Sequence, residues 1–394
     1  MSSTLTPSAV AAAVDDDGYV EEVVGMIITG VTGVFGNALL AEFLKAIPDI
    51  YQHNNKKERQ REAGNHSTPP RCCCYHFCLI GRDKERLEEV WSTSSTSSGV
   101  LDMYNSMSMI NIKHTSFTVD FMKSSSDDIR NFWYKTVLPT LSYPNGGNNH
   151  NKNNITTVYA FMNAGGVEPV GYLTDITSTT PLSIHQSIHF NLTSFIVSCG
   201  CIVEYCSNTN NDHHDNSSNR DDDNDDVKEL YLVNTTSLAA EVPMGGMAIY
   251  AMGKRSRDYI MRLLAYESVV KYNGKCVDHH HYLNWSPGPM CGPMTNTIVD
   301  HCDDPRTKDT FQRMLDEHDD IIKLTERHTS KGEMDGDDNG GNGHGTEQQQ
   351  GGGQQVADCS SSSRGSPSTS ASSPFVDPMV SAGKCIKCLL EGNY

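Results

Sequence analysis

The sequence predicts an α/β protein built on a doubly wound parallel sheet with helices on both faces. Short runs without polar alternation recur along the chain, and longer helical segments separate them. Strands that are apolar on both faces and linked by helices are typical of parallel sheets. In addition, a glycine-rich turn directly follows the first apolar run and opens the first helical segment. These two observations together predict the fold class.

Six segments are the expected strands, at residues 23–29, 73–80, 113–119, 157–162, 230–233 and 282–285. The expected helices are 35–47, 84–90, 127–141, the stretch around Tyr250, and a late amphipathic segment at 380–390. Right-handed crossovers between such strands give a doubly wound sheet, and ligands bind such sheets at the carboxyl ends of the strands.

Polar, low-complexity segments interrupt this pattern at 52–70, 92–107, 144–153, 207–227 and 329–373. They contribute to a hydrophobic content of only 37% and a mean hydropathy of −0.47. Without them and a polar N-terminus at 1–23, which we expect to be disordered, roughly 260 residues remain, which suits one domain. We therefore expect a single domain over 24–394 with surface insertions, because long insertions cost little free energy.

The net charge of −18 excludes some partners. An acidic chain repels nucleic-acid backbones and anionic membranes, so we expect neither as a partner. We find neither a run of about 18 apolar residues nor a basic region ahead of the N-terminal apolar stretch. Several of the 13 Cys lie in an apolar run, which favours a reduced, cytoplasmic protein. Cys385 with Cys388, and His279–His281, are weak metal signals, and no metal is expected.

The glycine-rich turn reads TGVTGVFG over residues 29–36. Glycines in this position let the chain turn tightly and let a diphosphate approach the helix N-terminus. An ordinary strand–turn–helix connection is the alternative, but the position near the N-terminus favours a Rossmann-type dinucleotide site. The expected cofactor contacts in the turn are Gly30, Thr32, Gly33, Val34, Phe35 and Gly36.

Arg82 follows the second expected strand and Asp120 follows the third. A basic residue after the second strand accommodates the 2′-phosphate of NADP, so Arg82 favours NADP(H) over NAD. A surface ion pair is the alternative role for Arg82. Asp120 lies where it could meet the adenine.

Tyr250 and Lys254 form a YxxxK pair on one face of an expected helix. A lysine ammonium beside a phenol lowers the pKa of the tyrosine, which could then give a proton to a carbonyl oxygen during hydride transfer. In a chain with 16 Tyr the spacing itself arises by chance about once. The surroundings are more specific. Further polar residues follow other strands or lie between them: Asn163, Ala164, Gly165, Asn191, Ser237, Pro287 and Gly288.

These motifs resemble the classical short-chain dehydrogenases, and among them the sepiapterin reductases. The similarity is carried by FNLTS, VNTTSLAA, IYAMGKRSRDYIMRLLAYE, LNWSPGPM and VDPMVSAGKCIKCLLE. The resemblance implies that Tyr250 is the general acid, that Lys254 binds the ribose, that Ser237 orients the carbonyl and that Asn191 supports a proton relay. Asn163, Ala164, Gly165, Pro287 and Gly288 would bind the cofactor. Leu238, Met244, Met247 and Met290 would join Ser237 and Tyr250 around the substrate.

By the same resemblance, NADPH reduces the side-chain carbonyl of a pterin, and the protein is a homodimer through the helices carrying Asn191 and Tyr250. The chain departs from the family pattern at several places. Val34 stands where the family has its middle glycine, and Gly292 stands where it has a threonine near the nicotinamide. Met244 and Met247 replace pocket aromatics, which widens substrate tolerance. The chain stops at Tyr394, before a final strand with an acidic residue, so we expect an uncovered sheet edge.

Two alternatives stay open. One is a broad-specificity carbonyl or ketoacyl reductase on the same scaffold. The other is a non-catalytic NADP-binding module.

Overall fold

The computed structural model describes residues 21–61, 72–97, 110–141, 155–179, 181–207, 228–271, 279–332 and 375–392. Its centre is a parallel sheet of β1 (Glu21–Thr29), β2 (Cys72–Gly81), β3 (Ile110–Thr118), β4 (Ile155–Met162), β5 (Glu229–Thr235) and β6 (His280–Trp285). The order is β3-β2-β1-β4-β5-β6, a doubly wound sheet whose direction of winding changes between β1 and β4. The predicted fold class is confirmed, and all six expected strands are present.

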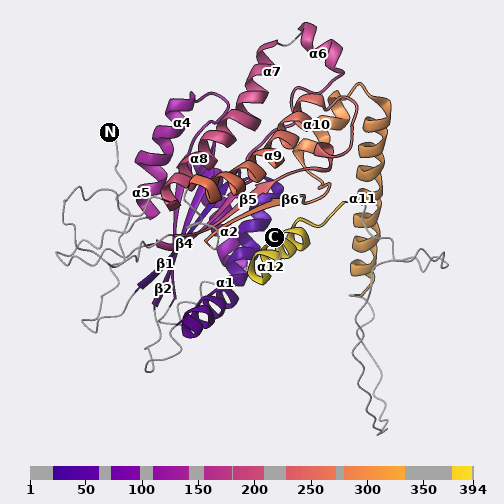
Figure 1. The fold of residues 1–394 in the computed structure, drawn as a ribbon. Coiled ribbons are helices and arrows are strands. Elements are labelled where there is room, and N and C mark those ends of the chain that lie inside the picture. Colours follow the sequence, from indigo (N-terminus) through magenta and orange to yellow (C-terminus); the bar gives the residue numbers. More distant parts are fainter. Residues whose placement is uncertain are drawn as a thin grey trace, which may run out of the picture.

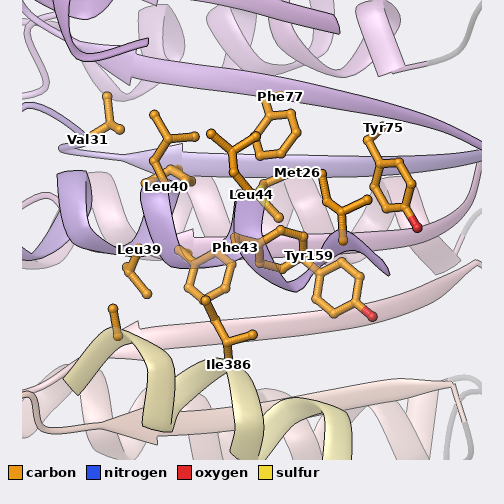
Figure 2. Close-up of a cluster of buried hydrophobic side chains, with 14 of the residues drawn as sticks. Met26, Val31, Leu39, Leu40, Phe43, Leu44, Tyr75, Phe77, Tyr159 and Ile386 are labelled. Carbon is orange, nitrogen blue, oxygen red and sulfur yellow. The ribbon is translucent and has the colours of Figure 1, made fainter. Parts of the chain in front are cut away.

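One face of the sheet is covered by α1 (Val34–Arg61), α2 (Lys84–Ser97) and α12 (Pro378–Glu391) (Figure 1). Phe43 of α1 lies at the centre of this layer, and its ring meets the ring of Tyr159 edge-on at 5.2 Å. Ile386 of α12 packs into the same cluster (Figure 2). The chain's last described helix therefore lies against its first, so residues from both ends of the sequence build one core.

The opposite face carries α4 (Ser126–Phe132), η1 (Trp133–Val137), α5 (Leu138–Leu141), α8 (Ser194–Ser207) and α9 (Ala248–Lys271) (Figure 1). Trp133 is fully buried there and donates to the Ser198 hydroxyl at 2.8 Å. The chain enters α8 through α6 (Leu173–Thr179), α7 (Pro181–Ile188) and η2 (His189–Thr193). Near the carboxyl edge lie η3 (Leu238–Ala240), α10 (Pro293–His301) and α11 (Pro305–Gly332).

Some predicted insertions are helical where the structure describes them. Helix α1 continues to Arg61, α2 to Ser97 and α11 to Gly332, so the segments 52–61, 92–97 and 329–332 extend helices and are not loops. Lys, Glu, Arg and Gln, which are good helix formers, make up most of 52–61, so the polar composition of that segment does not end the helix. Most of the remaining insertion residues, and residues 1–20, lie outside the described residues.

The combined helix Pro181–Ser207 reaches the length and hydropathy of a membrane span, with a mean hydropathy of 1.3. The expectation that no segment would do so is therefore wrong. Half of this apolar window is buried inside the fold, where Phe195 and Ile202 of α8 pack with the core on the α9 side of the sheet. A core helix between a sheet and other helices accounts for this composition.

His280, the first residue of β6, predicts a pH-dependent loss of stability. Its side chain is 6% exposed, and neither ring nitrogen has a hydrogen-bond partner in the described part of the chain. Burial, with neighbouring His279 and His281, lowers the pKa of His280 to about 4. Because the unfolded chain binds this proton near pH 6.5, the unfolded state holds more protons between pH 6.5 and 4, and stability falls as the pH drops through that window.

We expect His280→Phe to remove this dependence. Between pH 6.5 and 4 the wild type should lose up to about 3 kcal/mol more unfolding free energy than the variant. Urea denaturation at both pH values measures the difference. Equal losses in the two proteins would assign the acid sensitivity to other groups.

Candidate active site

The turn between β1 and α1 forms a cradle that only glycine can line. Gly30 has φ +66°, and a Cβ there would lie 2.9 Å from the Cα of Ala164. A Cβ on Gly36 would lie 2.4 Å from the Gly30 carbonyl oxygen and 2.8 Å from the Cα of Val31, both backbone atoms that cannot move aside. The turn therefore brings backbone close together at the start of a long helix, whose first N–H groups attract anions. This geometry fits the diphosphate of a dinucleotide.

The end of β4 is tied to this turn. The Asn163 side-chain amide donates to the Gly30 carbonyl at 3.1 Å, and the Ala164 N–H donates to the Thr29 hydroxyl at 3.1 Å. The structure thus brings Asn163 and Ala164 beside the glycine turn. Of the other turn residues, Thr32 is half-buried, and Phe35 is buried in the core between α1 and the sheet. Phe35 can therefore offer a cofactor only its backbone.

Arg82 and Asp120 lie along the same edge, at the ends of β2 and β3. The Gly30 N–H donates to the Ile80 carbonyl at 2.9 Å, so the glycine turn directly adjoins the end of β2. Arg82 is exposed beyond that point. Asp120 accepts from the Met122 N–H at 3.1 Å and lies 3.6 Å from the Lys123 ammonium. Arg82 is thus available to a 2′-phosphate.

Ser237, Tyr250 and Lys254 meet at the carboxyl end of β5. Tyr250 and Lys254 lie on one face of α9, both buried, with the Lys254 Nζ 5.8 Å from the centroid of the Tyr250 ring. Lys254 donates to the Thr235 carbonyl at 2.6 Å. The Tyr250 hydroxyl is hydrogen-bonded to Ser237, whose own oxygen accepts from the Ala239 N–H at the start of η3. The predicted catalytic trio is one cluster in space.

The protonation of this cluster differs from the expectation. The pKa of Tyr250 is raised, because burial outweighs the hydrogen bond from Ser237 and the positive charge of Arg257. Burial and the charge of Arg257 hold the pKa of Lys254 well below its usual range. The expected lowering of the Tyr250 pKa by Lys254 is therefore wrong for the chain by itself: desolvation decides the sign.

Asn191 holds backbone instead of reaching the tyrosine. It is fully buried in η2, accepts from the Gly166 N–H at 3.0 Å and donates to the Gly166 carbonyl at 2.9 Å and to Ser187 at 3.1 Å. A Cβ on Gly165 would lie 3.1 Å from the Asn191 Oδ1 and 3.6 Å from the Lys254 Nζ. Asn191, Gly165 and Lys254 are therefore neighbours, while a proton relay through Asn191 stays a prediction.

Arg257 belongs to the site, and sequence reasoning missed it. Its guanidinium is 1% exposed and donates to the backbone carbonyls of Asn191 and Ala164, the latter at 2.8 Å. It also lies 4.7 Å from the ring centroid of Phe195. Burial lowers its pKa to about 10. A signal was present: Arg257 follows Lys254 by three positions, so it shares the helix face of Tyr250 and Lys254.

The substrate-side residues separate into two groups. Met247 packs with Tyr250 in a small cluster that includes Ile298, and Met244 lies against the same cluster. Leu238 is 53% exposed beside Ser237. Met290, in contrast, packs against the core on the α1 side. The structure therefore places Met244 and Met247, but not Met290, around Tyr250.

The loop after β6 is anchored by the segment leading into α12. Gly288 has φ +84°, and a Cβ there would lie 2.6 Å from Val376. The Pro287 carbonyl accepts from the Ser381 hydroxyl at 3.1 Å. The loop holding Pro287 and Gly288 is thus fixed from the far end of the sequence.

Two other features lie apart from this edge. Within the described ranges, no group of three or more His, Cys, Asp or Glu could hold a metal ion. A cavity of about 360 Å³ opens between α4, α8 and α9, with Tyr134, Glu204 and Lys271 in its lining. It lies on the outer side of the helix layer and shares no residue with the tyrosine cluster.

No protein-family model and no curated protein matches the sequence. Solved structures with a similar backbone fold are found. A short chain dehydrogenase from Escherichia coli CFT073 complexed with NADPH is 13% identical, covers 73% of this chain and 85% of its own, and has a TM-score of 0.44. One from Shigella flexneri 2a complexed with NADP is 14% identical, with 69% and 79% covered and a TM-score of 0.41. One from Salmonella enterica serovar Typhi is 13% identical, with 72% and 84% covered and a TM-score of 0.43. At such values function must be read from this chain's own residues.

Proposed function

We propose that this protein is an NADP(H)-dependent carbonyl reductase. The observation that carries the proposal is the meeting of Ser237, Tyr250 and Lys254 at the carboxyl end of β5, on the same sheet edge as the glycine cradle. Burying a lysine beside a tyrosine opposes folding, because both lose hydration. We attribute this buried pair to a catalytic role at this edge of the sheet, because ionisable groups with perturbed pKa values cluster at functional sites.

Bound NADPH would supply a hydride to the carbonyl carbon. The hydroxyls of Ser237 and Tyr250 would hold the carbonyl oxygen, and Tyr250 would give that oxygen its proton as the alcohol forms. The raised pKa keeps Tyr250 protonated at neutral pH, as a proton donor requires. The positive charge of Arg257 stabilises the phenolate left behind. Lys254, fixed by the Thr235 carbonyl, would bind the ribose.

For the substrate we propose the side-chain carbonyl of a pterin, on the strength of the motifs shared with sepiapterin reductases. The second candidate is a broad range of carbonyls. It is favoured by Met244 and Met247, which pack with Tyr250 and are flexible enough to fit several shapes.

NADPH oxidation measured with sepiapterin, with simple diketones and without a carbonyl tests these proposals. Turnover of sepiapterin supports the pterin reductase, and turnover of diketones alone supports the broad reductase. Cofactor binding without any turnover would make the chain a non-catalytic NADP-binding module. If NADPH does not bind, the proposal is wrong in every form.

Preference for NADP(H) depends on Arg82 in this proposal. Arg82→Glu should weaken NADPH binding by about tenfold or more, because the guanidinium is exposed at the end of β2 where the 2′-phosphate would lie. NADH binding should change little. Fluorescence titration with both cofactors checks this, and Arg86→Glu, at an exposed position in the first turn of α2, is the matched control. An equal loss for both cofactors would argue against the assigned role.

We further propose a cytoplasmic homodimer that contacts its second copy through α8 and α9. These helices expose large apolar side chains, among them Ile196, Leu263 and Tyr266. Sedimentation of the wild type and of Ile196→Glu tests the dimer, which the charge should dissociate. No disulfide joins the ten cysteines whose side chains the structure describes, which suits a reducing compartment. We propose no nucleic-acid or membrane partner, since the chain is strongly acidic.

A further inference from the structure

Val34 and Gly292, at the N-terminal ends of two different helices, lie against each other across the carboxyl edge of the sheet. Val34 is the first residue of α1, after β1, and Gly292 precedes α10, after β6. A Cβ on Gly292 would lie 2.8 Å from the Val34 Cγ2. Strands β4 and β5 lie between β1 and β6, so this contact bridges the edge where the glycine turn and the tyrosine cluster face each other.

The backbone conformation at position 292 does not require a glycine. Its φ of 167° is extended and open to any residue. Gly292 is the N-cap of α10, a position where glycine and threonine serve about equally well, and it forms no side-chain cap. The feature that excludes a side chain is the contact with Val34. Val34 is 37% exposed, so packing in the core does not require a valine at that position either.

The loop carrying Gly292 cannot move aside to admit a side chain. Its carbonyls at Pro287 and Pro289 accept from the Ser381 hydroxyl at 3.1 Å and the Val376 N–H at 2.8 Å. The Met290 carbonyl accepts from Thr295 at 2.7 Å. A larger residue at position 292 would therefore clash with Val34, which lies in the first turn of α1 beside the glycine cradle.

We propose that Val34 and Gly292 are a matched pair that closes the loop after β6 over the diphosphate part of the cofactor site. Cofactor affinity then depends on the two residues jointly, not on either one alone. The inference rests on the proposed function, because the cradle is taken to hold NADP(H).

The test is a double-mutant cycle with Gly292→Thr, Val34→Gly and both together. NADPH dissociation constants come from fluorescence titration, and melting midpoints are measured without cofactor. Gly292→Thr should weaken NADPH binding by about tenfold or more. The double variant should bind within about threefold of the wild type, because removal of the valine side chain makes room for threonine.

The melting midpoints separate this pair from simple capping. By capping alone, threonine at position 292 leaves the midpoint nearly unchanged, because threonine and glycine are about equally good N-cap residues. In a matched pair it lowers the midpoint when Val34 is present and leaves it nearly unchanged in the Val34→Gly background. Gly292→Ala, which adds the clash without a cap, should lower the midpoint at least as far as threonine does.

NADPH binding by Gly292→Thr at wild-type strength would overturn the pair, as would a double variant that binds as weakly as Gly292→Thr. Failure of the proposed function looks different, because the wild type itself would then bind no NADPH.

Discussion

Replacing Tyr250 with Phe should lower the rate of carbonyl reduction by about a thousandfold, the middle of the range for general acid catalysis. The phenyl ring keeps its place beside Met247 and Ile298, so packing is preserved. What disappears is the hydroxyl that would give its proton to the carbonyl oxygen and that bonds to Ser237. NADPH affinity should therefore stay within about threefold of the wild type, since the glycine cradle and Lys254 are untouched.

Single-turnover kinetics with saturating NADPH measure this loss without interference from cofactor binding. Tyr259→Phe is a suitable control, because Tyr259 lies on the same helix but is 62% exposed and outside the cluster. It should behave as the wild type. Substantial activity in Tyr250→Phe would show that another group donates the proton.

The sheet could be predicted because each strand is indicated by the residues within and next to it. Most strands contain a run of apolar residues bounded by polar or glycine-rich sequence, and the turn between β1 and α1 is recognisable by its glycines. Helix ends were not predictable in the same way. Helix α1 continues past Ile47 into sequence rich in Lys and Arg up to Arg61, where amphipathic periodicity fades although helix propensity remains.

The site was predictable as a set of residues but not as an electrostatic environment. The spacing of Tyr250 and Lys254 shows that they share a helix face. The sign of the Tyr250 pKa shift instead depends on burial by Val167, Ile298 and other residues distant in sequence. The contact of Val34 with Gly292 likewise requires the strand order, which joins positions far apart along the chain.

Arg257 shows the same limit, since a charged residue in a helix is usually on the surface. Here its side chain is buried, and the two backbone carbonyls that accept from it belong to different parts of the site. Ala164 follows β4 at the glycine turn, and Asn191 lies in η2. One guanidinium therefore joins the cofactor side to the helix that carries Asn191, while its charge acts on Tyr250.

Replacing Arg257 with Met should lower kcat by about a hundredfold and destabilise the fold by about 3 kcal/mol, because two backbone carbonyls lose their donor. Arg257→Lys should keep the charge but reach at most one of these carbonyls, since an ammonium lacks the fork of a guanidinium. Both variants should therefore lose stability in urea denaturation.

The pH profile of kcat distinguishes the charge from the geometry. Reduction requires protonated Tyr250, so activity falls as the pH rises through the pKa of this tyrosine. The positive charge of Arg257 lowers that pKa. Arg257→Met should therefore move the alkaline fall of activity to higher pH, whereas Arg257→Lys should leave it near the wild-type position. An alkaline limb that moves in neither variant would limit Arg257 to holding the backbone, and a limb that moves equally in both would tie the shift to lost geometry.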